Sequence, residues 1–390
     1  MHIIWAISKL GGGGAEHVMF QLANYMQQAG SENEILVTNQ GNVETNYYGA
    51  STKIPCTFIE GKKNKFNLAV LILQLTCKVF EKLHIKIPFA LQHATFEKIY
   101  DDELKAIACF LKERKDAVIV AFLHPTDQLM MMAAKQFKNP IIVSERADPI
   151  RYFEKKYTKM FLDLYYPLID GMVFQTPNAM QCYPENVQKK GTVILNPVSG
   201  LLPNRYDGKR EKIIVNFCRL SAQKNLYLLI DAFEIFFESH QDYLLRIYGN
   251  GELEAEIRSY AASKKSGKRI QILPHRDDIH EVIRSYAMFV SSSDFEGVSN
   301  SMLEAMAIGL PVVCTDCPIG GAAYVIEDHI NGILVPLNNA ERMATAMAEI
   351  ADNPELAKIL SINSVKLKEQ LSIESIGNQW LSYISERCGS

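Results

Sequence analysis

The stretch of sequence that decides the fold is SSSDFEGVSNSMLEAMAIGLPVVCT, residues Ser291–Thr315. An apolar run ends where the stretch begins, and the small polar residues up to Ser299 favour a loop followed by a helix N-cap. Apolar residues then recur at helical spacing, Gly309 predicts the end of the helix, and Pro311 prevents it from continuing. The stretch therefore predicts a strand, a loop, a short helix and a second strand.

Two carboxylates lie eight positions apart in this unit, Glu296 in the loop and Glu304 about one turn into the helix. Free backbone N–H groups and the helix dipole make the helix start favourable for an anion. A phosphate bound there would have a hydrogen-bond acceptor on either side. This suits a nucleotide sugar, with ribose on one carboxylate, diphosphate at the helix start and sugar on the other carboxylate. A surface helix with two solvated glutamates is the alternative.

The spacing of these glutamates, followed by EAMAIGLPVV, resembles the signature of retaining GT-B glycosyltransferases, specifically glycosyltransferase family 4. The resemblance extends diffusely from Ile3 to Trp380 and is sharp at 219–224 and 296–304. It implies an α/β chain with the GT-B fold, in which two Rossmann-like domains with parallel sheets face a central cleft that holds the donor.

Length and composition place the chain among ordinary globular proteins. A chain of 390 residues exceeds what one hydrophobic core serves, so two domains are expected. A hydrophobic content of 48% and a charged content of 22% are typical of an ordinary soluble globular protein, and a net charge of −3 gives no sign of nucleic-acid binding. Eight scattered cysteines show no zinc-binding pattern and indicate buried thiols in a reducing cytoplasm. The opening MHIIWAI lacks the features of a signal peptide, and no apolar run reaches membrane-spanning length.

Apolar runs alternate with helical patterns along the chain, which predicts parallel sheets. The expected strands are 3–7, 34–38, 54–59, 117–123, 140–144, 171–175, 193–195, 212–218, 244–248, 269–273 and 333–335.

Four consecutive glycines, 11–14, follow the first expected strand and precede a helix over 15–28. The G-x-G-x-x-G pattern of dinucleotide-binding proteins fails here, because its third glycine would fall on Glu16 or His17. The glycines allow close approach to the backbone, and the helix start favours an anion. The resemblance implies that this loop, with Gly13 and Gly14, faces the donor diphosphate and sugar. A flexible turn without a ligand is the alternative.

Polar residues follow two of the expected strands, in the segments FLHPTD and SERADP. In open α/β sheets, ligands bind beyond the carboxyl ends of the strands. Both segments resemble parts of family members that build bacterial capsules, exopolysaccharides and lipid-linked oligosaccharides. The resemblance implies a catalytic role for His124 and acceptor contacts by Glu145 and Arg146. Some relatives have a functional histidine near the position of Arg146, and a purely structural role for His124 is the alternative.

The segment Lys62–Gln92 combines an apolar run, Leu68–Leu75, with flanking lysines. This composition fits a helix at an anionic membrane surface. A core helix with solvated lysines at its ends is the alternative. The flanking lysines are Lys62, Lys63, Lys65, Lys78, Lys82 and Lys86.

The turn-forming residues from Asn196 to Gly208 mark the best domain boundary. We expect an acceptor-binding domain over 1–200 and a nucleotide-sugar-binding domain over 201–370. A C-terminal helix within 371–390 is expected to pack back on the first domain.

Arg219 ends a strand, and Lys224 follows five positions later at a helix start. Two cations converging there would neutralise a diphosphate and stabilise it as a leaving group, a use that the resembled family makes of this spacing. Two solvated surface cations are the alternative. With Glu296 and His124, both cations are the expected catalytic residues. The resemblance also assigns donor binding in the second half to Arg219, Lys224, Arg276, Glu296, Ser299, Asn300, Ser301 and Glu304.

We therefore expect transfer of a hexosyl or N-acetylhexosaminyl unit from a UDP-sugar to a polyprenyl-diphosphate-linked saccharide, without a cofactor or a metal. The enzyme would be cytoplasmic and peripherally associated with the inner face of the cytoplasmic membrane. A GT-B epimerase, a nicotinamide oxidoreductase and a non-catalytic sugar-nucleotide or membrane-binding module are the alternatives. The failed glycine pattern speaks against the oxidoreductase.

Overall fold

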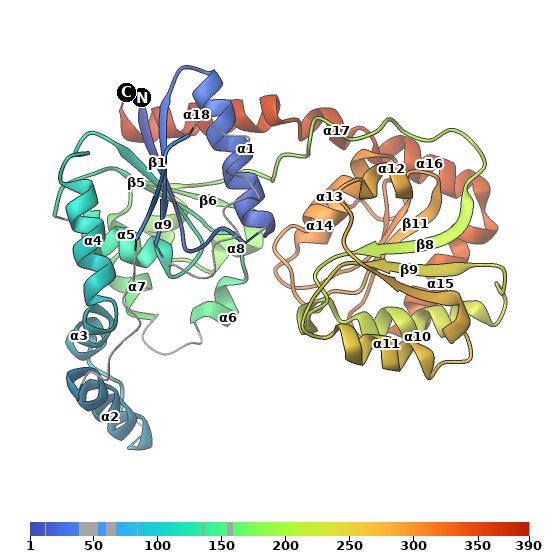
Figure 1. Ribbon diagram of the computed structural model, residues 1–390, viewed down its shortest axis with the longest axis horizontal. Coiled ribbons are helices and arrows are strands. Elements are labelled where there is room, and N and C mark those ends of the chain that lie inside the picture. Colours follow the sequence, from blue (N-terminus) through green and yellow to red (C-terminus); the bar gives the residue numbers. More distant parts are fainter. Residues whose placement is uncertain are drawn as a thin grey trace. The chain divides into compact units, whose positions relative to one another are not determined.

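The computed structural model describes residues 1–11, 13–38, 54–59, 68–83, 85–134, 136–153 and 159–389. The chain divides into two compact units: unit 1 is Met1–Ile194 with Gly377–Ser390, and unit 2 is Leu195–Ile376. Each unit is built on its own parallel sheet, with helices packed around it (Figure 1). This confirms the predicted α/β class.

The sheet of unit 1 has its described strands in the order β3-β2-β1-β4-β5-β6-β7, all parallel. The strand order reverses between β1 and β4, which is the topological switch point of such a sheet. The strands are β1 (His2–Ile7), β2 (Glu32–Val37), β3 (Cys56–Phe58), β4 (Val118–Phe122), β5 (Ile141–Ser144), β6 (Gly171–Phe174) and β7 (Gly191–Val193).

The helices of unit 1 connect these strands, and the C-terminal helix joins them. From Gly377 onward this last helix packs on the sheet: the Trp380 ring stacks on Phe122 at 6.0 Å between centroids and contacts Trp5 at 6.2 Å. The Met172 amide also donates to the hydroxyl of Tyr383 at 2.7 Å. The helices are α1 (Gly14–Gln28), α2 (Leu68–Lys82), α3 (Phe89–Ile99), α4 (Asp101–Leu111), α5 (Thr126–Ala134), α6 (Pro149–Phe153), α7 (Lys159–Leu164), η1 (Tyr166–Leu168), α8 (Pro177–Gln181), α9 (Glu185–Gln188) and α18 (Ile373–Cys388).

The sheet of unit 2 has the order β10-β9-β8-β11-β12-β13 and is also parallel throughout. Its switch point lies between β8 and β11. Leu229, Phe233 and Met347 join the inner side chains of the strands in one buried core. The strands are β8 (Glu211–Phe217), β9 (Leu244–Tyr248), β10 (Ile270–Leu273), β11 (Tyr286–Ser291), β12 (Val312–Thr315) and β13 (Ile333–Val335).

The helix predicted from the stretch that decides the fold is present, with the expected ends. Ser299 is its N-cap, and its side chain accepts from the Met302 amide; Gly309 follows its end with φ of 70°, a conformation that favours glycine. The helices of unit 2 are η2 (Ala222–Lys224), α10 (Leu226–Phe237), α11 (Glu254–Ala262), η3 (Gly267–Arg269), α12 (Ile279–Ile283), α13 (Asn300–Ala307), α14 (Gly321–Val325), α15 (Ala340–Asp352), α16 (Pro354–Ser364) and α17 (Leu367–Gln370).

The predicted strands are all present, with ends that differ by a few residues. The segment 62–92 contains α2 and the start of α3, whereas Lys62, Lys63 and Lys65 lie outside the described residues. None of the helices in the described part of the chain has the length and apolar character to span a bilayer.

Candidate active site

The switch point of unit 2 brings two distant loops together. Because β8 and β11 are parallel neighbours, their carboxyl ends lie at the same edge of the sheet. The loop after β8 carries Arg219 to Asn225, and the loop after β11 carries Ser292 to Ser299. Predicted site residues from both loops therefore meet at the place where open α/β sheets bind ligands.

Lys224 and Glu296 are paired at this edge. The Lys224 Nζ donates to Glu296 Oε2 at 2.8 Å, and the Gln223 Nε2 donates to the same oxygen at 2.9 Å. The side chains of Lys224 and Glu296 are 15% and 18% exposed. The other carboxylate oxygen, Oε1, has no hydrogen-bond partner among the residues that the structure describes. The pair is preorganised and retains capacity for a ligand.

The loop after β8 is held rigidly against the loop after β11. Asn225 is left-handed (φ 40°), donates from Nδ2 to Asp294 Oδ1 at 2.7 Å, and accepts from the Leu228 amide as the cap of α10. The Ser292 hydroxyl contacts the carbonyls of Lys224 and Asn225, each at 2.9 Å. These bonds fix the backbone that carries Lys224.

A turn after β12 supports Glu296 from the other side. The Glu296 amide donates to the Pro318 carbonyl at 2.7 Å, and the Ile319 amide donates to the Glu296 carbonyl at 3.1 Å. A Cβ at Gly321 would lie 1.5 Å from the Gly297 carbonyl oxygen, so a side chain cannot be accommodated there without movement. The turn after β12 thus holds the loop that carries Glu296.

The second carboxylate, Glu304, lies on α13. Its Oε2 is 3.0 Å from the Nε2 of His280 on α12, and the two side chains are 21% and 22% exposed. Asn300, in the first turn of α13, accepts from Asn196 Nδ2 at 2.6 Å. The neighbouring Ser301 is partly buried.

Two thiols lie close to the Lys224–Glu296 pair. Burial raises the pKa of Cys218 to about 12, with Lys224 opposing and Glu296 adding to the shift. Burial and Glu296 likewise raise the pKa of Cys317 to about 12. Both thiols therefore stay neutral at physiological pH. Among the residues that the structure describes, the positive charge of Lys224 is then paired only with the Glu296 carboxylate and remains able to attract an anionic ligand.

Two predicted donor-binding cations lie outside this network. Arg219 is exposed. Arg276 is also exposed, and its guanidinium makes two hydrogen bonds to Asp278, at 2.8 and 2.7 Å. Donor binding by Arg276 stays a prediction that requires this guanidinium to contact a ligand as well.

At the switch point of unit 1, a carboxylate of the chain itself binds the amides of the glycine loop. Glu16, in the first turn of α1, accepts from the amides of Gly11 and Gly13, the latter at 3.0 Å. A side-chain carboxylate therefore already occupies two of the N–H groups that the glycines present. A donor contact by Gly13 and Gly14 stays a prediction.

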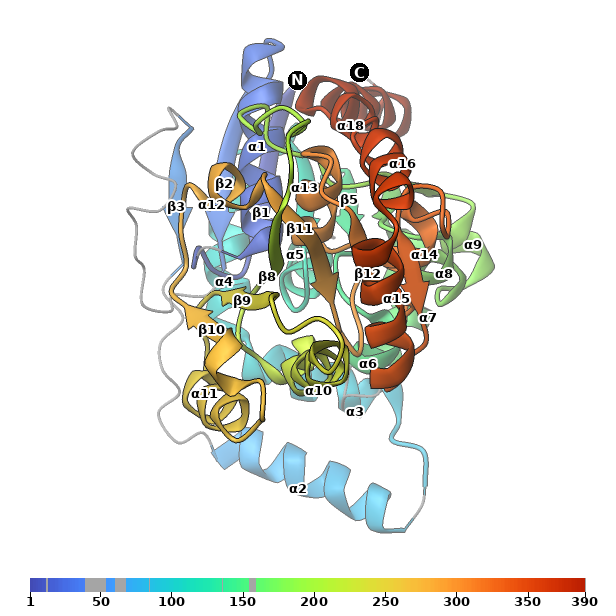
Figure 2. The ribbon, with the colours of Figure 1, turned by 90° about the vertical axis from the view of Figure 1, so that its right-hand side faces the viewer.

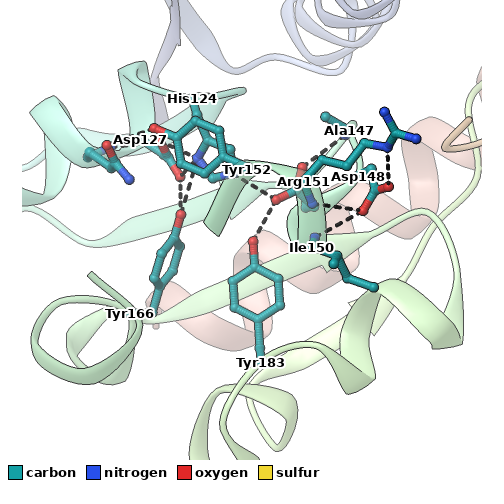
Figure 3. A network of polar contacts seen from close by, with 11 residues as sticks. His124, Asp127, Ala147, Asp148, Ile150, Arg151, Tyr152, Tyr166 and Tyr183 are labelled. Carbon is teal, nitrogen blue, oxygen red and sulfur yellow. Dashed lines mark hydrogen bonds and ion pairs between the residues drawn. The ribbon is translucent and has the colours of Figure 1, made fainter. Parts of the chain in front are cut away.

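His124, just after β4, is clamped between two carboxylates (Figure 3). Its Nδ1 lies 2.7 Å from Asp127 Oδ2, its Nε2 lies 3.0 Å from Glu145 Oε2, and the side chain is only 4% exposed. Tyr166 donates to Asp127, and Tyr183 donates to Glu145 at 2.5 Å.

The charge state of this network follows from its contacts. Burial alone lowers the pKa of His124, but Asp127 and Glu145 outweigh it and raise that pKa to about 10. The ring is therefore a buried imidazolium. Both of its nitrogens are engaged, so a direct catalytic role for His124 stays a prediction that requires the network to open.

The predicted acceptor residues belong to the same edge. Glu145 is buried and also accepts from the Ala147 amide at 2.9 Å. Arg146 donates to Ser144 Oγ at 2.7 Å, and its guanidinium lies over the rings of Phe122 and Trp380. Burial lowers the pKa of Arg146 to about 9.

Several residues of these sites carried no distinctive pattern in the sequence. They contact the predicted site residues because the fold brings separate loops together at the edge of a sheet. Patterns of neighbouring residues in the sequence do not predict such contacts. These residues are Gln223, Asn225 and His280 in unit 2, and Tyr152, Tyr166 and Tyr183 in unit 1.

Residues 205–366, which include the whole Lys224–Glu296–Glu304 set, match the family described as glycosyl transferases group 1. An alpha-1,4-N-acetyl-D-galactosaminyltransferase of Campylobacter jejuni is 22% identical over 389 residues, covering 99% of each chain. An uncharacterized glycosyltransferase of Haemophilus influenzae is 28% identical over 187 residues, which are 48% of this chain and 53% of that protein.

The fold is shared with solved structures over the full described chain. HepE of Anabaena in complex with UDP superposes with a TM-score of 0.77, at 15% identity, covering 99% of this chain and 100% of that one. The two parallel sheets, the match of residues 205–366 and these relatives together identify the protein as a glycosyltransferase with the GT-B fold.

Proposed function

We propose that the protein is a retaining glycosyltransferase of family 4. It transfers a hexosyl or N-acetylhexosaminyl unit from a UDP-sugar to a polyprenyl-diphosphate-linked saccharide in the assembly of bacterial surface polysaccharide or glycan. The observation that carries the proposal is the partly exposed Lys224–Glu296 pair at the switch point of unit 2, with Glu304 on the adjacent helix.

Each residue of this set has a role that its chemistry suits. Lys224 uses one N–H on Glu296 and has two further donors for the diphosphate, and Arg219 adds a second cation. Glu296 contacts the sugar, and Glu304 accepts from the ribose hydroxyls. Ser301 and Asn300 lie in the first turn of α13, whose dipole favours the diphosphate.

The donor and the acceptor rest on the relatives. HepE is described in complex with UDP, which supports a uridine nucleotide. The Campylobacter jejuni relative is named for an acceptor on diphosphate-linked undecaprenol, which supports a lipid-linked saccharide.

In the proposed step the acceptor oxygen bonds to the anomeric carbon as the bond from that carbon to the UDP oxygen breaks. The acceptor proton passes to the departing diphosphate on the same face, so the configuration is retained and UDP leaves. Lys224 and Arg219 stabilise the charge that develops on the diphosphate, so the step is proposed to need no metal.

A donor screen tests the proposal. The purified full chain is incubated with UDP-glucose, UDP-galactose, UDP-N-acetylglucosamine, UDP-N-acetylgalactosamine and GDP-mannose, with and without bacterial membrane lipid extract. We expect one UDP-sugar to release UDP only when the extract is present, and NMR of the product to show the donor's anomeric configuration. Release of a rearranged sugar without extract would identify an epimerase. If no donor yields free nucleotide or free sugar, the protein would instead be a non-catalytic binding module.

We further propose that α2 brings the enzyme to the membrane that holds this acceptor. One face of α2 exposes Leu68, Leu71, Ile72, Leu75 and Val79, which recur at helical spacing. The opposite side packs on α3, and α2 lies beyond α3 at the outside of unit 1 in both views (Figures 1 and 2).

Exposed lysines near the end of α2 give this apolar face a charge that complements anionic lipid. Lys78 and Lys82 each lie three residues after an exposed apolar residue of the face, and Lys86 follows the helix. An amphipathic helix with this composition binds at the interface of an anionic bilayer, where each lysine contributes about 1 kcal/mol. This would place the enzyme at the inner face of the cytoplasmic membrane.

Vesicle sedimentation tests this second proposal. Wild type should sediment with phosphatidylglycerol-containing vesicles, less so as salt is raised, because charges are screened over about 8–10 Å. Replacing Lys78, Lys82 and Lys86 by Glu should abolish sedimentation and transfer to the lipid-linked acceptor, but not binding of UDP. The matched control replaces the exposed Lys112, Lys209 and Lys358 by Glu. Equal sedimentation of both triple variants would exclude α2 as the contact.

A further inference from the structure

The proposed function gives no role to the contact between His280 and Glu304. His280 is on the short helix α12 after β10, whereas Glu304 is on α13 after β11. Their side chains meet at 3.0 Å between Nε2 and Oε2. Because an ionised carboxylate only accepts hydrogen bonds, the Nε2 of His280 is the donor.

This donor fixes one oxygen of the carboxylate and leaves the other available. Among the residues that the structure describes, Glu304 Oε1 has no hydrogen-bond partner, and the side chain is partly exposed. The terminal torsion of a glutamate is broad and has no strongly preferred value. A single donor on Oε2 therefore selects the plane of the carboxylate and the direction of Oε1.

The imidazole is itself held in place. The His280 ring lies edge-on to the ring of Phe217 at the end of β8, with centroids 5.8 Å apart and an angle of 87°. Phe217 in turn packs edge-on against the buried Phe289 of β11 at 5.3 Å. The His280 ring therefore contacts an aromatic pair that continues into the core of unit 2, and this contact restricts the directions in which Nε2 can donate.

We propose that His280 is a positioning residue that aims the Glu304 carboxylate at the ribose of the donor and so makes the enzyme discriminate ribose from 2′-deoxyribose. The proposal rests on the proposed ribose contact of Glu304. A carboxylate held in one plane can accept from two neighbouring ribose hydroxyls at once, whereas a freely rotating one must be ordered when the nucleotide binds. Loss of the His280 donor should therefore weaken the contact with the ribose hydroxyls and leave contacts with the diphosphate unchanged.

The test compares two ligands that differ only in the ribose. Dissociation constants of UDP and 2′-deoxy-UDP are measured by calorimetry for wild type, His280→Ala, His280→Gln and Glu304→Gln. In wild type, 2′-deoxy-UDP should bind more weakly. In His280→Ala this preference for UDP should shrink roughly fivefold, the usual worth of one hydrogen bond. In His280→Gln it should largely return, because the glutamine amide nitrogen can take the place of Nε2.

The control is His240→Ala, which removes another histidine–carboxylate contact of the same length, His240 Nε2 to Asp352 Oδ1 at 3.0 Å, at the surface of unit 2. It should keep the wild-type preference. An unchanged preference in His280→Ala, together with a lost preference in Glu304→Gln, would overturn the positioning role alone. An unchanged preference in Glu304→Gln would instead overturn the ribose contact, and with it both proposals about this carboxylate.

Discussion

Charged side chains are paired at the switch points of both sheets, but the two pairings differ in how much of their polar atoms remains exposed to solvent. Beside the switch point of unit 1, after β4 and β5, His124 and its two carboxylates are almost fully buried. At that of unit 2, between β8 and β11, Lys224 and Glu296 remain partly exposed. Both edges place a cation on a carboxylate where open α/β sheets bind ligands.

The difference shows how burial decides what a charge pair can do. In unit 1 every ring nitrogen and both carboxylates have protein partners, because a buried charge without such partners is strongly destabilising. In unit 2 the remaining donors of Lys224 and the Oε1 atom of Glu296 can bind water and exchange it for a ligand. We interpret the first cluster as architectural and the second as the ligand site.

The largest expected effect is on the stability of unit 1. His124→Gln leaves two buried carboxylates without their cation and should lower the free energy of unfolding by about 3–5 kcal/mol. Both tryptophans of the chain, Trp5 and Trp380, lie in unit 1, so tryptophan fluorescence during urea unfolding reports this unit. The control is His240→Gln, which should change the fluorescence midpoint little.

The same network predicts the sign of a pH dependence. The pKa of His124 is raised to about 10, so its stabilisation is fully present below the unfolded value of about 6.5 and is lost as pH rises through 10. Wild-type unit 1 should therefore lose stability between pH 7 and 10, and His124→Gln should lack this part of the slope. Parallel slopes in the two proteins would show that His124 is not the titrating group.

The next effect concerns turnover in unit 2. Lys224→Ala and Arg219→Ala should each lower turnover roughly 10²–10³-fold, because each removes a cation that we propose stabilises the departing diphosphate. The tryptophan unfolding midpoint should not change. Lys212→Ala, which removes the surface ion pair with Asp242, is the matched control and should keep wild-type turnover. Near-wild-type turnover in both site variants would show that the open edge is not the site of chemistry.

The smallest expected effect on turnover comes from Gln223, which helps to position the carboxylate of Glu296. Gln223→Ala removes one of the two donors to Glu296 Oε2 and should lower turnover about fivefold, the worth of a single hydrogen bond. Gln223→Glu should lower it further, because a like charge then faces Glu296. If Gln223→Glu is as active as wild type, the rigidity of Glu296 has no part in catalysis.

Much of this fold could be predicted because its signals are local. Gly309 ends α13 through a left-handed conformation, Ser299 caps the same helix, and the apolar run of β11 marks a strand, each through residues a few positions apart. The roles of single site residues were harder to read. The sequence does not distinguish an exposed lysine from one that is paired with a carboxylate. Likewise, no residue pattern near His124 predicts that its side chain is buried.

The sequence by itself determined the α/β alternation, the caps of α13 and the residue types at the strand ends. Only the tertiary structure decided which of them meet. The order β8-β11 places Lys224 on Glu296 across 72 positions, and the order β4-β5 places His124 on Glu145 across 21. The physical reason is that helices, caps and turns are fixed by neighbours in the chain, whereas strand order, and with it the burial of every charge at a sheet edge, is fixed by packing of the whole core.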